Sequence, residues 1–275
     1  MQREITSRKR IGLALGSGAA RGLAHIGVLA ALQKLGIRID MISGTSMGAL
    51  VGAVFAKGED IDSMKELAVE LGAKRFSFLV DPALPTTSLI SGRKIDSMLT
   101  SIFGEVEFPE LDVPFVCSAT DIESGQEVIL NQGLVKTGVK ASCSIPVILA
   151  PTRYDGRFLV DGALVNPVPV SLLKRMGADI VIAVNVVSVE SGNSQGDSTK
   201  KSKQKTPNIL SIAFQTVNIV SSQKLLACQS EADIVINPQV SHIGRGDFHR
   251  VDELVLEGER AVFACEEELK RLGGS

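Results

Sequence analysis

Ser46 lies at the centre of the pentapeptide Gly44–Gly48 (GTSMG), which fits the Gly-x-Ser-x-Gly pattern of a nucleophile elbow. Such an elbow holds a serine on a sharp strand-to-helix turn and aims its hydroxyl group at a substrate above the sheet. The alternative is an ordinary turn in which the serine only caps the following helix. A short apolar run precedes Ser46 and a helical run follows it, and this context favours a nucleophile.

A second glycine-rich segment, Gly16–Gly22 (GSGAARG), also follows a short apolar run. One interpretation is a phosphate-binding loop at a helix N-terminus. The dinucleotide-binding pattern requires a glycine where Arg21 stands, however, and no Walker lysine is present. The other interpretation is an oxyanion hole, in which backbone N–H groups stabilise the negative oxygen of a tetrahedral acyl intermediate. The spacing favours the oxyanion hole.

An activated serine needs a base, and the residues leave two candidates. The chain has only three histidines: His25, His242 and His249. The order Ser46, Asp161 and then a late histidine matches the triad order of α/β-hydrolases. Asp161 is itself the alternative base, because it ends an apolar strand and opens the tight turn Asp161–Ala163 (DGA). A carboxylate within hydrogen-bonding reach can act as a general base, so both arrangements remain open.

The elements that must position these residues alternate between strand and helix. The first 58 residues predict a strand over 11–15, a glycine-rich loop, a helix from Leu23, a strand over 39–42, the elbow and a helix to Ala56. This order predicts a parallel βαβ unit covered by helices. Further apolar patterns predict helices over 60–72, 95–103, 134–142, 170–176, 209–228 and 251–272, and strands over 114–120, 128–130, 180–187 and 234–236. A hairpin is predicted over 153–160, with its turn at Asp155-Gly156.

We expect one α/β domain over residues 1–275, with its core motifs in 11–187. Residues 190–207 contain no large apolar side chain in their central part and several lysines, so we expect a mobile loop there. Helices are expected over 208–275. The proline-containing segment 73–93 is expected to lie on the surface.

Composition excludes several classes of protein. With 29 Lys+Arg against 31 Asp+Glu, the chain lacks the basic excess of a nucleic-acid-binding protein. The four cysteines are far apart, which argues against a zinc site and for reduced thiols in a cytoplasmic protein. The apolar run over 11–32 imitates a signal peptide, but Arg21, His25 and several glycines interrupt it, so neither a signal peptide nor a spanning helix is expected.

Three motifs in this order resemble those of bacterial patatin-like phospholipases and of the neuropathy target esterase catalytic domain. They are the segment Leu15–Gly22 followed by His25–Leu29, the elbow around Ser46, and the Asp161–Ala163 turn. The resemblance covers roughly residues 10–187. It implies a three-layer α/β fold with a mostly parallel central sheet flanked by helices. It also implies a Ser–Asp dyad without a catalytic histidine, which hydrolyses acyl esters of phospholipids or lysophospholipids through an acyl-enzyme, without metal or cofactor.

Carried over to this sequence, the resemblance makes Ser46 the nucleophile and Asp161 the base. The N–H groups of Gly18 and Ala19 become the oxyanion donors. The remaining motif positions support the loop, the elbow and the turn, namely Gly16, Ser17, Arg21, Gly22, Gly44, Gly48, Gly162 and Ala163. The family's loop is often all glycine, so an alanine that required a positive φ here would be strained.

Two other functions remain open: a non-lipid esterase or thioesterase that uses the same dyad, and a catalytically idle adaptor with the same fold. The presence of both Ser46 and Asp161 argues against the adaptor, because a binding module needs neither.

A lipid ester substrate would be met at an interface. Four lysines, at positions 200, 201, 203 and 205, precede apolar residues that recur at helical spacing from Ile209 to Val220. This pattern predicts transient contact with an anionic membrane surface, at the inner face for a cytoplasmic protein. The alternative is a solvated loop before a core helix.

Overall fold

A computed structural model describes residues 8–73, 92–187 and 209–273. The expected mobile loop around 190–207 and most of the expected surface segment 73–93 lie outside these residues. Among the described helices, none is long and apolar enough to cross a membrane.

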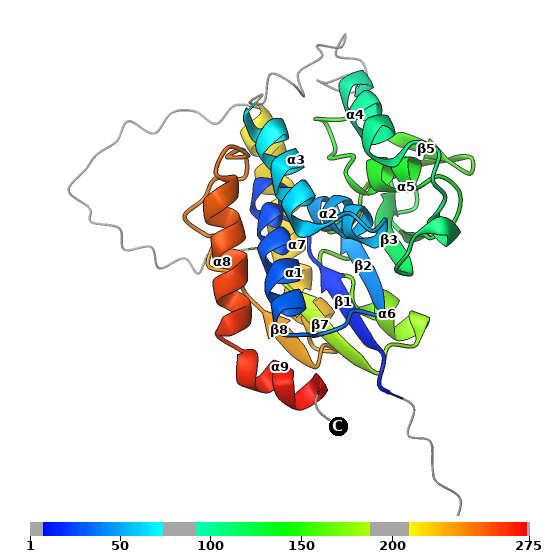
Figure 1. Cartoon of the computed structure of the whole chain (residues 1–275). Helices are drawn as coiled ribbons and strands as arrows, with labels where there is room; N and C mark the ends of the chain where they lie inside the picture. The colour runs from blue at the N-terminus through cyan, green and yellow to red at the C-terminus, as the bar shows by residue number, and fades with distance from the viewer. Residues whose placement is uncertain (1–7, 74–91, 188–208, 274–275) are drawn as a thin grey trace, which may run out of the picture.

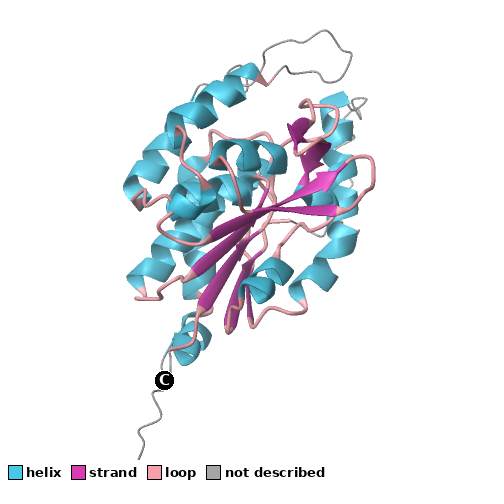
Figure 2. Cartoon of the chain, turned by 90° about the vertical axis from the view of Figure 1, so that its right-hand side faces the viewer, coloured by secondary structure: helices cyan, strands magenta, loops and turns pink. Residues whose placement is uncertain are grey.

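A twisted mixed sheet runs through the middle of the described structure (Figures 1 and 2). Its strand order is β5-β6-β3-β2-β1-β7-β8, and β4 pairs with β3. The parallel strands are β1 (Ile11–Leu15), β2 (Met41–Thr45), β3 (Phe115–Asp121), β7 (Ile180–Val184) and β8 (Ile234–Ile236). The antiparallel strands are β4 (Glu127–Leu130), β5 (Thr152–Tyr154) and β6 (Arg157–Asp161). The expectation of a mostly parallel sheet is therefore confirmed.

Helices cover both faces of this sheet, which gives three layers (Figures 1 and 2). One face packs against α1 (Ala24–Lys34), α2 (Met47–Ala56), α3 (Ile61–Ala73) and α8 (Val251–Phe263), and the other against α6 (Val170–Met176) and α7 (Ile209–Gln229). Successive residues of β1 point to opposite faces, so that Leu13 joins one hydrophobic cluster and Ala14 the other. Because β1 is buried on both faces, its sequence is a continuous apolar run.

The remaining helices lie at the margins of these layers. Helix α4 (Arg93–Phe103) packs on α5 (Val135–Ser142), close to the antiparallel strands, and α9 (Glu266–Gly273) ends the described chain. Short 3-10 helices are η1 (Ala19–Leu23), η3 (Phe108–Glu110) and η4 (Gly162–Leu164).

The predicted βαβ unit is present, because β1 and β2 pair in parallel and α1 connects them. The second strand starts and ends later than predicted, and β7 ends at Val184 instead of residue 187. The single helix predicted over 251–272 was wrong, because α8 and α9 are separate. The Cys265 N–H bonds to the Val262 carbonyl three residues back, which tightens the end of α8. Three glutamates, Glu266–Glu268, then occupy the first turn of α9, where negative charge favours a helix start.

Candidate active site

Ser46 stands between the end of β2 and the start of α2, and its backbone adopts φ 56° and ψ −122°. This conformation is unusual for a residue with a side chain and is typical of a strained functional turn. A Cβ atom at Gly48 would lie 2.1 Å from the Leu15 carbonyl oxygen, so only glycine fits where α2 passes over the end of β1. The Ser46 N–H donates to Ser142 Oγ at 2.9 Å, and that hydroxyl donates to the Ser118 carbonyl at 2.7 Å. The elbow is therefore fixed from two sides.

Asp161 lies within hydrogen-bonding distance of Ser46, although 115 residues separate them: Ser46 Oγ donates to Asp161 Oδ2 at 2.6 Å. The sheet register explains this contact. Thr45 of β2 pairs with Ser118, and Asp161 of β6 pairs with the adjacent Ala119. Ser46, which follows Thr45, and Asp161 therefore lie on opposite sides of β3 at nearly the same position along that strand.

The tight turn after Asp161 holds its carboxylate in one orientation. Asp161 Oδ1 accepts a hydrogen bond from the Ala163 N–H at 2.8 Å, and Thr120 Oγ1 donates to the Asp161 carbonyl at 2.9 Å. A Cβ atom at Gly162 would lie 2.2 Å from the Ser118 carbonyl oxygen, so the turn packs directly on β3. Both carboxylate oxygens are therefore engaged, and Oδ2 is directed at Ser46.

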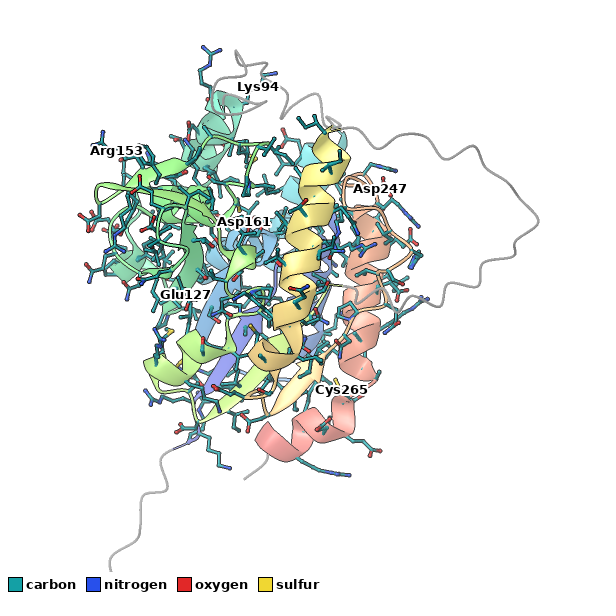
Figure 3. All side chains as sticks on the ribbon, turned by 180° about the vertical axis from the view of Figure 1, so that it is seen from behind. Lys94, Glu127, Arg153, Asp161, Asp247 and Cys265 are labelled. Atoms are coloured by element: carbon teal, nitrogen blue, oxygen red, sulfur yellow. The ribbon has the colours of Figure 1, made fainter. Side chains whose placement is uncertain are left out.

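Asp161 is only 1% exposed. Burial raises its pKa from 3.8 to about 6, and the hydrogen bonds from Ser46 and Ala163 oppose part of that rise. At neutral pH the carboxylate is mainly ionised, yet its pKa is close enough to neutrality for it to accept a proton during a reaction. Figure 3 shows Asp161 near the middle of the molecule, beside α7.

The loop Gly16–Arg21 is held by its backbone on both sides of Gly18 and Ala19. Ser17 N–H donates to the Pro167 carbonyl at 2.8 Å, and Ala20 N–H donates to the Arg245 carbonyl at 3.1 Å. Within the described parts of the chain, no acceptor pairs with the N–H groups of Gly18 and Ala19. Ala19 adopts a positive φ of 50°, the strained conformation anticipated for an alanine here. The loop thus presents two adjacent backbone N–H groups without an acceptor among the described residues.

The side chains of Arg21 and His25 hold this loop in place through hydrogen bonds. Arg21 is 7% exposed, and its guanidinium donates to the Ile243 carbonyl at 2.6 Å and to the Ser241 carbonyl at 2.7 Å. His25 Nε2–H donates to the Gly16 carbonyl at 2.7 Å. Burial lowers the pKa of His25 to about 4, so the ring is neutral at pH 7.

The histidines do not form a triad with Ser46. All three lie in described parts of the chain, and His25 is bonded to Gly16, as above. His242 pairs with Glu253 at 2.9 Å and is exposed, as is His249. No hydrogen bond joins any of the three rings to Ser46 or Asp161 in the described structure. Of the two candidate bases, only Asp161 contacts the serine.

An apolar cavity of about 160 Å³ opens beside the serine hydroxyl. Its described walls come from η1, α2, α3, α4, α7 and the loops that follow α5 and β8. They consist of Ala19, Leu23, Ser46, Met47, Leu50, Ala68, Leu71, Gly72, Ile95, Met98, Leu99, Cys143, Ile145, Ile148, Leu149, Phe214 and Phe248. Among the described residues of this wall, Ser46 is the one that bears a hydroxyl group, so an apolar group in the cavity would place an attached ester next to that hydroxyl.

Sequence reasoning missed the cavity and the residues that hold the dyad from outside the motifs. Ser142 and Thr120 sit in ordinary helix and strand patterns, and nothing in their neighbourhood distinguishes them before folding. Cys143 also lines the cavity, and burial keeps the pKa of its thiol well above the ordinary value, which disfavours the reactive thiolate. In the described ranges, no group of three or more His, Cys, Asp or Glu side chains is arranged to hold a metal ion.

Comparisons with known proteins place this arrangement in a family. The family model described as patatin-like phospholipase matches residues 13–174. An uncharacterized NTE family protein of Mycobacterium tuberculosis is 38% identical over 187 residues, which cover 68% of this chain and 52% of that protein. Lysophospholipase NTE1 of Debaryomyces hansenii is 32% identical over 273 residues, which cover 92% of this chain and 18% of that protein. The chain thus spans about half the length of the mycobacterial relative and under a fifth of the yeast one.

Among solved structures, VipD from Legionella pneumophila has a similar fold, with a TM-score of 0.59 and 13% sequence identity. The match covers 95% of this chain and 67% of VipD. The family model spans the glycine-rich loop, the elbow and the Asp161 turn, and it ends within α6. With its three-layer fold and this extent of sequence similarity, the chain belongs to the patatin-like phospholipase family.

Proposed function

We propose that this chain is a serine acyl hydrolase that cleaves carboxylic ester bonds of phospholipids or lysophospholipids. The observation that carries the proposal is the 2.6 Å contact from Ser46 Oγ to Asp161 Oδ2 beside an apolar cavity. A buried carboxylate with a pKa of about 6 can take the serine proton, and the cavity can hold an acyl chain. The name of the yeast relative, a lysophospholipase, agrees with this substrate class.

In the first half of the reaction, Ser46 Oγ attacks the ester carbonyl carbon while its proton passes to Asp161 Oδ2. The resulting oxyanion accepts hydrogen bonds from the N–H groups of Gly18 and Ala19. When the tetrahedral intermediate collapses, the C–O bond to the alcohol breaks and the leaving oxygen takes the proton from Asp161. The products are a free alcohol and an acyl group esterified to Ser46.

In the second half, Asp161 accepts a proton from a water molecule as that water attacks the acyl carbonyl carbon. The same amides bind the second oxyanion. Collapse of this intermediate returns the proton to Ser46 Oγ and releases the fatty acid. The dyad is then ready for another substrate.

The two alternatives make different demands on the site. A non-lipid esterase or thioesterase would use the same dyad but would not need a cavity walled by so many apolar side chains, and an idle adaptor would need neither Ser46 nor Asp161. The deciding experiment offers phosphatidylcholine, lysophosphatidylcholine, an acyl thioester and a short-chain ester to the protein and measures acid release from each. Trapping with a fluorophosphonate, followed by peptide mass spectrometry, identifies the acylated residue. Preferred release from the two lipids with the label on Ser46 supports the proposal, whereas preference for the thioester or the short ester favours the non-lipid enzyme.

Enlarging Ala68 is expected to shorten the acyl chain that the enzyme accepts. Ala68 belongs to α3, lines the cavity and is 6% exposed. A phenylalanine there would displace two or three methylene groups of a long chain, at about 0.8 kcal/mol each, so Ala68→Phe should lower kcat/KM for a sixteen-carbon ester by roughly 15- to 60-fold. A four-carbon ester should be hydrolysed almost as before.

The neighbouring Val69 provides the matched control, because it is 46% exposed and does not line the cavity. Val69→Phe should leave both esters unaffected. If Ala68→Phe slowed the short and long esters equally, the substitution would have damaged the site as a whole. Unchanged hydrolysis of the long ester would place the acyl chain elsewhere.

Transient contact with an anionic membrane surface remains part of the proposal. Helix α7 supports it, because its outward face carries exposed apolar residues: Ile209, Ile212, Ile219 and Leu226. Co-sedimentation with liposomes should increase with the fraction of anionic lipid and decrease with added salt, which screens surface charges. Replacing the four lysines between positions 200 and 205 by glutamine should abolish the increase. If this variant sedimented as well as the wild type at low salt, the lysine segment would be only a linker.

A further inference from the structure

A segment beyond the family-model match contacts both the turn that follows Asp161 and the proposed oxyanion loop. The match ends at residue 174, whereas α7 begins at Ile209 and the loop after β8 continues to Arg250. Figure 3 shows α7 running past Asp161. Three sets of contacts connect this segment with the catalytic elements.

The first contact reaches the turn of the base. Ser221 of α7 is 2% exposed, and its Oγ lies 2.9 Å from the Ala163 carbonyl and 2.7 Å from the Val217 carbonyl. A hydroxyl group has one proton, so Ser221 donates to one of these carbonyls at a time. Ala163 is also the residue whose N–H donates to Asp161 Oδ1. When it donates to the Ala163 carbonyl, Ser221 therefore holds the residue that orients the carboxylate.

The second contact reaches the oxyanion loop. Arg21 donates to the carbonyls of Ser241 and Ile243, and the Ala20 N–H donates to the Arg245 carbonyl. Ala20 and Arg21 directly follow Ala19, one of the two proposed oxyanion donors. The backbone of residues 241–245 thus determines where that end of the loop lies.

The third contact joins the first two. The Arg245 guanidinium donates to Asn218 Oδ1, and Asn218 is 6% exposed. Asn218 lies three residues before Ser221, so both side chains are on the same buried face of α7. One helical turn therefore contacts the base turn directly and the oxyanion loop through Arg245.

We propose that Ser221 and Asn218 are positioning residues, through which α7 aligns the base and the oxyanion donors with each other. The inference rests on the proposed function of the dyad. It assigns the two residues different effects. Loss of the Ser221 hydroxyl should weaken the bond from Ala163 N–H to the Asp161 carboxylate, whereas loss of the Asn218 amide should leave that bond intact and displace the oxyanion loop.

The kinetic test compares Ser221→Ala and Asn218→Ala with the wild type over pH 4–9, using the substrate that the lipid panel identifies. A weaker bond to the ionised Asp161 raises its pKa, so Ser221→Ala should move the acid limb of kcat/KM upward by about half a pH unit or more. Asn218→Ala should lower kcat about tenfold or more with little change in KM or in the acid limb, because the oxyanion donors act mainly in the transition state.

Two further variants separate positioning from general loss of structure. Ser222 is the next residue of α7, and no hydrogen bond joins its side chain to the Ala163 turn in the described structure, so Ser222→Ala should match the wild type. Ser221→Thr keeps the hydroxyl and should restore the acid limb. An unchanged acid limb in Ser221→Ala, or an equal shift in Ser222→Ala, would overturn the role of Ser221. Unchanged kcat in Asn218→Ala would overturn the role of Asn218.

Amide hydrogen exchange makes the test independent of the chemistry. Ser221→Ala should speed exchange in residues 161–165 and Asn218→Ala in residues 18–21, each relative to Ser222→Ala, with thermal unfolding confirming that every variant is folded. If the wild type neither hydrolyses esters nor labels at Ser46, the proposed function fails, and exchange still decides whether α7 holds the two segments. If the wild type is active and exchange is unchanged in the variants, the positioning roles alone fail.

Discussion

Replacing Ser46 by alanine is expected to lower kcat/KM for ester hydrolysis by about 10⁴-fold or more, because no acyl-enzyme can form without the hydroxyl group. The fold should survive. Alanine has a Cβ atom like serine, so it meets the same backbone strain at φ 56°, and the lost hydroxyl makes one side-chain bond, to Asp161. Fatty-acid release and fluorophosphonate labelling should disappear together, while the circular dichroism spectrum stays the same.

An exposed serine elsewhere provides the control for this variant. Ser101 lies on α4 and faces solvent, so Ser101→Ala should keep full activity and labelling. If Ser46→Ala still reacted with the phosphonate at a different serine and still released fatty acid, the nucleophile would lie elsewhere.

Replacing Asp161 by asparagine is expected to cost as much activity as the loss of Ser46, because nucleophile and base act as one unit. An amide of nearly the same shape can occupy the turn but cannot accept the serine proton. Comparison of kcat/KM for the two single variants and the double variant tests this. The double variant should be no slower than either single variant. A second, multiplied loss would mean that the two residues act separately.

The same substitution should stabilise the fold at neutral pH. Burial raises the pKa of Asp161 from 3.8 to about 6, so the folded protein binds this proton more tightly than the unfolded chain does. In the wild type, the stabilisation of the fold by this bound proton is fully present below pH 3.8 and is lost as the pH rises through 6. At pH 7 the ionised carboxylate therefore costs the fold about 3 kcal/mol, taking 1.36 kcal/mol per pKa unit, and Asp161→Asn should recover up to that amount.

His25 contributes the opposite pH dependence. Burial lowers its pKa from 6.5 to about 4, so stability is lost as the pH falls from 6.5 to 4. In the wild type the two slopes oppose each other between about pH 4 and 6. Urea unfolding of Asp161→Asn should show a steeper loss of stability on acidification than the wild type, because the opposing contribution of Asp161 is removed while that of His25 remains. A variant less stable than the wild type at pH 7 would contradict the burial cost assigned to Asp161.

Activity measurements on variants of the two exposed histidines distinguish the dyad from a triad. His242→Ala and His249→Ala should keep most of the activity that Asp161→Asn loses. A loss of about a thousandfold in either histidine variant would indicate a histidine base that reaches Ser46 in the reacting complex.

Much of the fold could be predicted because local patterns specify it. The alternation of apolar runs with glycine-rich turns determined the β1–α1–β2 unit, and α6 begins and ends where its pattern predicts. The β5–β6 hairpin followed from Asp155-Gly156, whose φ values of 46° and 76° are those that such a pair adopts readily. The break between α8 and α9 was missed because no glycine or proline marks it, and the apolar periodicity continues across it.

In the candidate site, too, local patterns predict some residues, whereas others are identified only by tertiary contacts. Motif spacing alone singled out Ser46 and Asp161, because a nucleophile elbow and a tight acidic turn each need particular small residues next to the reactive one. The residue types and their order left open whether Asp161 or a histidine would contact the serine, and that contact depended on β2 and β6 lying on either side of β3. The apolar cavity and the contacts of Arg21, Asn218 and Ser221 join residues from distant parts of the chain. Such contacts leave no periodic or local trace in the amino-acid order, since their geometry exists only after the sheet has assembled and α7 has packed across it.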